Sequence, residues 1–113
     1  MKGSELIALL KQVTPYRNEA VELDGVLAPK SAAMLMALLN TETDPVTRFE
    51  LYSNAILECR AAQRTEAAVK LSLAQYQEFN DVASLIAYSD ALAENGEFET
   101  GILRAKEALE LSI

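Results

Sequence analysis

Carboxylates at matching positions are the side chains of this chain with the most chemical potential. Glu58 and Glu94 end two related heptapeptides, and Asp90 precedes Glu94 by one helical turn. Paired carboxylates can transfer protons or bind a hard cation such as Ca²⁺. Carboxylates at helical spacing more commonly form a solvated helix face, because ionised side chains are rarely buried. We therefore expect a charged surface here and no metal site.

The groups needed for most other enzyme chemistry are missing. The chain has no histidine, and its one cysteine is Cys59. Without histidine it lacks the commonest general base, the imidazole metal ligands and the base of Ser-His and Cys-His nucleophiles. We expect Cys59 to be a small buried side chain in a reducing compartment. Because no Gly-rich phosphate loop is present either, the sequence predicts no enzyme and no cofactor.

Composition and charge exclude further classes of function. The chain has 113 residues, half of them hydrophobic, and a net charge of −7 from 10 basic and 17 acidic residues. This length fits one domain, and the acidic balance predicts no nucleic-acid or anionic-membrane partner. The longest apolar run, 32–39, is far shorter than the roughly 20 residues of a membrane span. With no signal-peptide pattern at the start, we expect a cytoplasmic protein.

Helix-forming residues dominate the whole chain, and no long stretch alternates as a strand would. Asp44-Pro45 opens one helix as N-cap and first residue, and Asn95-Gly96 ends another. Segment 15–30 is harder to interpret: 17–23 fits one or two helical turns, and Asp24-Gly25 is a loop signal. The polar stretch 60–65 is the expected turn in a long helical region. The expected helices cover 4–13, 32–39, 45 to about 60, 66–77, 82–94 and 97–111.

A self-match is the strongest organising signal. Tyr52-Ser53-Asn54-Ala55-Ile56-Leu57-Glu58 returns as Tyr88-Ser89-Asp90-Ala91-Leu92-Ala93-Glu94, displaced by 88 − 52 = 36 residues. Four of the seven positions are identical. A self-match at this spacing is typical of stacked helical repeats, which bury apolar faces against each other and present a surface for partners.

The segment 85–111 resembles a tetratricopeptide repeat, a helix-turn-helix unit of 34 residues. Tyr88 and Ser89 match the large-small pair of its first helix, and Gly96 marks the turn. Phe98 is the aromatic residue after the turn, and Gly101 takes the small position where the two helices cross. Two positions depart from the family pattern, since Leu85 replaces its tryptophan and Ala105 its second-helix aromatic.

The resemblance implies an all-α fold of antiparallel helix-turn-helix repeats, with five to six helices in a short right-handed superhelix. We expect a single domain, 1–113. Residues 81–113 form its clearest unit, 45–80 a weaker unit without glycine in the turn, and 1–44 N-terminal helices that can form a degenerate repeat. In the final helix we expect an inward or partly inward apolar face composed of Phe98, Ile102, Ala105, Leu109 and Leu111. A generic helix bundle with a chance heptapeptide echo is the alternative.

In tetratricopeptide proteins the first helices of successive units line a groove for the partner. The positions that match this groove are Glu50, Asn54, Leu57 and Glu58 in one unit and Ile86, Asp90, Ala93 and Glu94 in the next. The groove so implied is acidic with apolar patches. The subgroup that binds the C-terminal carboxylate of heat-shock chaperones has a basic residue where this chain has Glu50, so that ligand is disfavoured. A protein or peptide partner with basic and apolar residues fits better.

Three functions fit this reading. The first is a protein–protein interaction module, an adaptor or chaperone-like protein that holds a partner segment in the acidic groove. The second is an inhibitory protein of the immunity-protein or antitoxin type, which would mask a basic site with Glu97, Glu99, Glu107 and Glu110. The third is a structural protein that associates with itself, for example as a homodimer through the last helix.

Overall fold

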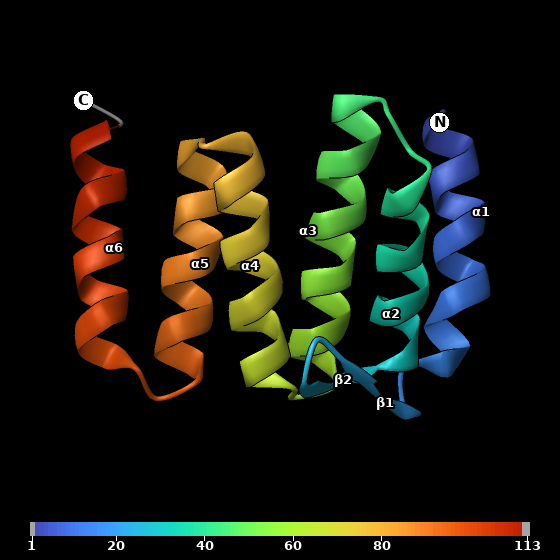
Figure 1. Cartoon of the computed structure of the whole chain (residues 1–113), viewed down its shortest axis with the longest axis horizontal. Helices are drawn as coiled ribbons and strands as arrows, with labels where there is room; N and C mark the ends of the chain where they lie inside the picture. Colours follow the sequence, from blue (N-terminus) through green and yellow to red (C-terminus); the bar gives the residue numbers. More distant parts are fainter. Residues whose placement is uncertain (1, 112–113) are drawn as a thin grey trace. The chain divides into compact units, whose positions relative to one another are not determined.

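The computed structural model describes residues 2–111, and this part of the chain is predominantly α-helical, with six α-helices and one short hairpin (Figure 1). The prediction of an all-α fold is confirmed. The chain divides into two compact units, residues 2–64 and residues 65–111. The repeat predicted over 45–80 therefore contributes its first helix to one unit and its second helix to the other. None of the helices within 2–111 is both long and apolar enough to cross a membrane.

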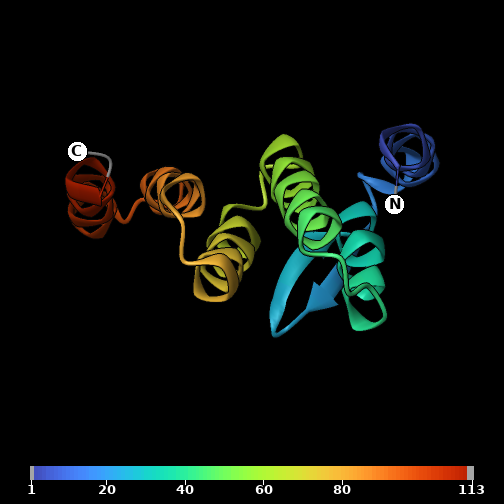
Figure 2. The same ribbon diagram turned by 90° about the horizontal axis from the view of Figure 1, so that it is seen from above.

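The first unit contains three α-helices and the hairpin. Its elements are α1 (Gly3–Val13), the 3₁₀ turn η1 (Thr14–Tyr16), β1 (Ala20–Leu23), β2 (Val26–Pro29), α2 (Lys30–Ala37), the 3₁₀ turn η2 (Leu38–Asn40) and α3 (Pro45–Ala61). Neighbouring helices run antiparallel (Figure 1). The hairpin packs on α2, and β2 also packs on α3 (Figure 2). Apolar side chains from α2, α3 and β2 form the core, with Leu35, Leu51 and Ala28 completely buried.

The hairpin corrects the expectation of helical turns in 17–23. Its strands pair antiparallel from Ala20 with Pro29 to Leu23 with Val26. Asp24 and Gly25 form the predicted turn and both have positive φ, at 50° and 85°, as a tight two-residue hairpin requires. Each strand has only four residues, too few for a clear alternating pattern, and two strands alone are marginally stable. Packing against the helices therefore decides the structure of this segment.

The second unit is a row of three antiparallel helices, α4 (Thr65–Phe79), α5 (Val82–Glu94) and α6 (Phe98–Leu111), seen from their ends in Figure 2. The predicted turn within 60–65 is confirmed, since α3 ends at Ala61 and α4 begins at Thr65. Gly101 lies where α6 crosses α5. A Cβ atom there would lie 3.1 Å from the backbone oxygen of Ser89, so the small residue expected at this crossing is required by contact.

The expected inward face of α6 is wrong. All five residues predicted for it are exposed: Phe98, Ile102, Ala105, Leu109 and Leu111. The side of α6 that faces α5 instead carries Gly101 and Ala108, both buried. Since α6 packs chiefly on α5, close contact through two small residues leaves the larger apolar side chains uncovered.

Candidate partner-binding surface

The first half of the predicted groove lies on α3. This helix begins where its sequence predicts: the backbone N–H of Thr47 donates to the side chain of Asp44 at 2.9 Å, with Pro45 at the first helical position. This bond and one from the Thr47 hydroxyl lower the pKa of the Asp44 carboxyl. The side of α3 that faces the core carries Leu51 and Ala55, neither of which has any exposed surface.

The side of α3 away from the core carries three of the predicted groove residues. Glu50 and Leu57 are exposed, and Asn54 is partly exposed, with its side-chain amide donating to the Glu50 backbone oxygen at 2.8 Å. Glu50 also lines a shallow hollow of about 250 Å³ between the starts of α1 and α3, together with Leu6 and Val46. The exposed patch on α3 therefore combines the Glu50 carboxylate and the Asn54 amide with the apolar side chains of Val46 and Leu57.

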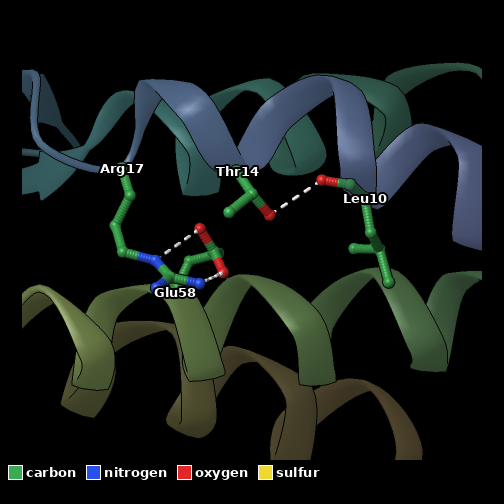
Figure 3. A network of polar contacts seen from close by, with 4 residues as sticks. All are labelled: Leu10, Thr14, Arg17 and Glu58. Carbon is green, nitrogen blue, oxygen red and sulfur yellow. Dashed lines mark hydrogen bonds and ion pairs between the residues drawn. The ribbon is translucent and has the colours of Figure 1, made fainter.

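Glu58, the fourth predicted residue of this helix, does not lie on an exposed surface. Its side chain is buried, and Arg17 binds it through two hydrogen bonds, Nε to Oε1 at 3.0 Å and Nη2 to Oε2 at 2.6 Å (Figure 3). Burial alone would raise the pKa of the Glu58 carboxyl, but the hydrogen bonds of Arg17, the nearby Ser31 hydroxyl and the charge of Arg17 together outweigh it, and the pKa is lowered. The expectation of a solvated Glu58 is wrong, because its charge is used within the first unit.

Arg17 is the ion-pair partner of Glu58, and the sequence did not reveal it. It follows η1, and that turn is joined to α1 by a hydrogen bond from the Thr14 hydroxyl to the Leu10 backbone oxygen at 2.8 Å (Figure 3). Forty-one residues separate Arg17 from Glu58, so no local spacing rule links them. The one available signal was indirect: Glu58 stands beside buried Cys59, and a carboxylate so close to a core requires a cation.

Cys59 is buried as expected. Burial, followed by the neighbouring Glu58 charge, raises the pKa of its thiol to about 12. The thiolate is the reactive form, so Cys59 is chemically inert in the folded protein. No group of three or more His, Cys, Asp and Glu side chains in the described chain is placed to hold a metal ion.

The second half of the predicted groove lies on α5. Ile86, Asp90 and Glu94 are exposed, at spacings of four residues along one face, and Ala93 beside them is partly exposed. The opposite side of the helix is buried through Leu85, Ala91 and Leu92. The structure thus places all four residues on one accessible side of α5, with an apolar side chain one turn before the first carboxylate.

The two heptapeptide helices end in the same backbone motif. At the end of α3 the N–H of Arg64 bonds to the oxygen of Cys59 and that of Gln63 to the oxygen of Arg60. At the end of α5 the N–H of Glu97 bonds to Leu92 and that of Gly96 to Ala93. Both are Schellman caps, whose pivotal residue has positive φ, at 59° for Gln63 and 83° for Gly96. The first repeat therefore forms the expected turn without the expected glycine.

The acidic residues proposed for an inhibitory surface are partly engaged within the second unit. Glu107 pairs with Arg104 at 2.7 Å, and Glu97 accepts a hydrogen bond from the Asn95 side chain at 2.9 Å. Glu99 and Glu110 are exposed on α6. Two of the four carboxylates proposed for this surface therefore already have partners within the second unit.

Comparisons with known proteins add no relative: no protein-family model, no curated protein and no solved structure matches this chain. The resemblance to tetratricopeptide repeats accordingly stays a prediction from the repeated residues.

Proposed function

We propose that this chain is a protein-interaction module, an adaptor that binds a segment of a partner protein through the exposed face of α5. One observation carries the proposal. Ile86, with 47% of its surface exposed, shares an accessible helix face with Asp90 and Glu94, while Leu85, Ala91 and Leu92 on the opposite side are buried. A rigid helix that presents an apolar anchor next to carboxylates suits recognition of a peptide.

The chemistry of this face defines the partner. An apolar side chain of the partner would cover Ile86, and a Lys or Arg one helical turn along would lie near Asp90 or Glu94. Opposite charges on the two surfaces raise the association rate and reject acidic competitors. The net charge of −7 acts in the same direction at longer range. The patch on α3, with Glu50, Asn54 and Leu57, is a second contact surface of the same chemistry.

A displayed library of random peptides, selected against the immobilised full chain, tests the proposal. We expect enriched peptides to combine an apolar residue with Lys or Arg. The double variant Asp90→Lys, Glu94→Lys should reduce binding of these peptides at least tenfold, because it reverses both charges around Ile86. Glu50→Lys measures separately whether the α3 patch contributes.

The matched control reverses two charges elsewhere. Glu22 on β1 and Glu66 on α4 are both exposed, and Glu22→Lys, Glu66→Lys should leave peptide binding nearly unchanged. Circular dichroism of both double variants confirms that helicity is retained. If no basic peptide is enriched, or if the two double variants bind equally, α5 is not the recognition surface.

A further inference from the structure

The exposed apolar side chains of α6 form a continuous stripe. Phe98, Ile102 and Leu109 are 64%, 55% and 65% exposed. At about 100° of rotation per residue, these three positions fall within roughly 40° of one another around the helix axis. The stripe borders the buried side of the helix at Gly101 and Ala108. Clustered apolar exposure of this kind, unlike scattered single residues, marks an interaction surface.

Acidic residues flank this stripe on its open side. Glu99 and Glu110 are exposed and lie about 80° to 100° beyond its centre, in the same rotational sense. Glu99 stands at the start of α6 and Glu110 near its end, with Lys106 between them. A complementary surface would therefore carry apolar side chains with a positive charge beside them at the end that meets Glu99.

The first helix of the chain offers that complement. Ile7 is 57% exposed, and it lines a shallow apolar hollow of about 400 Å³ at the end of α1 together with Leu10, Lys11, Thr14 and Pro15. Lys11 is exposed and follows Ile7 by about 40° around the axis, on the same rotational side as the acids of α6.

We propose that α6 of one molecule packs antiparallel on α1 of a second copy of this chain. In facing antiparallel helices, flanks of the same rotational sense meet on one side, so Glu99 comes to lie near Lys11. The same alignment places Phe98 near the hollow at Thr14 and Pro15. A parallel alignment would instead place these flanks on opposite sides of the contact, so that Glu99 could not meet Lys11.

The size of the contact sets its strength. Helices of 11 and 14 residues are about 16 and 21 Å long, so the contact buries less than the roughly 1,600 Å² of a standard interface. Weak association, with a dissociation constant between about 10 μM and 1 mM, is therefore expected. The contact joins two different surfaces, α6 of one copy and α1 of the other. A dimer forms if both such contacts can be made between the same two molecules, and an open polymer forms if they cannot.

Sedimentation velocity of the full chain between about 10 μM and 1 mM tests this proposal. The mean mass should rise with concentration for the original sequence. Lys11→Glu and Glu99→Lys should each weaken association about tenfold, and the two changes combined in one chain should restore it. Ile102→Ser should abolish association while circular dichroism shows unchanged helicity, because the side chain is exposed in the single molecule.

Two variants serve as controls. Gln12→Glu and Thr100→Lys change the charge at neighbouring exposed positions that face away from the stripes, and they should leave the mass profile unchanged. A monomer at every concentration would overturn the proposal. So would self-association that the single charge changes do not weaken, or a double variant that stays as weak as either single. These results are independent of peptide binding on α5, whose residues are not altered.

Discussion

Helices α3 and α5 carry nearly the same heptapeptide, yet their glutamates have opposite fates. Glu58 of α3 is 6% exposed and paired with Arg17, whereas Glu94 of α5 is exposed beside Asp90. The difference arises outside the repeat. The first unit brings the segment after η1 against α3 and delivers a guanidinium there. The same residue type is thus part of the internal structure in one helix and lies on the surface in the other.

Replacing each glutamate by alanine should separate the two roles most strongly. Glu58→Ala removes two charge-assisted hydrogen bonds and leaves Arg17, itself about one-third exposed, without its partner. We expect a loss of about 2 kcal/mol in the free energy of unfolding. Glu94→Ala should cost less than about 0.5 kcal/mol, as at most surface positions. Urea unfolding followed by circular dichroism measures both.

The alkylation rate of the buried Cys59 thiol is a second measure of how much each glutamate stabilises the first unit. Its alkylation in the native protein requires opening of the first unit, so a 2 kcal/mol loss should accelerate labelling roughly 30-fold in Glu58→Ala. The labelling rate of Glu94→Ala should match that of the original chain. Equal stability of the two alanine variants would show that the Arg17 pair is as weak as an ordinary surface contact.

Acid should weaken the contribution of Glu58 to stability. The pKa of Glu58 is lowered in the folded state, so its contribution to stability is complete above the ordinary glutamate value of 4.5 and is lost as pH falls through the lower folded value. We expect Glu58→Gln to flatten the decline in stability below pH 4.5. Thermal melting at a series of pH values measures this decline. Asp44→Asn tests the other carboxyl with a lowered pKa, which acts in the same direction.

The paired helix ends offer a smaller, reciprocal test. Gln63 adopts a left-handed conformation that side chains disfavour, whereas Gly96 adopts it freely. We expect Gln63→Gly to stabilise the protein by about 0.5–1 kcal/mol and Gly96→Gln to destabilise it by about 1 kcal/mol. Melting temperatures of the two variants would reveal the sign. If both changes destabilise, contacts of the Gln63 side chain outweigh its backbone cost.

The smallest effect on folding is expected on the face of α5. Asp90→Lys with Glu94→Lys should change the free energy of unfolding by less than about 0.5 kcal/mol, since both side chains are exposed. Denaturant melts of this variant would also validate the peptide-binding experiment. A large loss of stability would show that Asp90 and Glu94 support the fold as Glu58 does, and α3 and α5 would then not differ in this respect.

Local signals predicted most of the helical architecture. Asp44-Pro45 and Asn95-Gly96 were recognised because caps act within a few residues, and Gly101 was recognised through the resemblance to a tetratricopeptide repeat. The four-residue strands were missed because their stability comes from packing on α2 and α3. The burial of α6 was misjudged because an apolar pattern shows which side chains could be covered, without showing that a neighbour covers them.

By itself, the sequence determined that this protein is helical, where most of its helices start and stop, and that α3 and α5 carry nearly the same heptapeptide. These properties depend on backbone preferences and apolar spacing, which are set by residues close together in the sequence. Only the tertiary structure decided that Glu58 belongs to an ion pair while Glu94 faces solvent. The physical reason is that the environment of a charge depends on what folds against it, and Arg17 lies forty-one residues away along the chain.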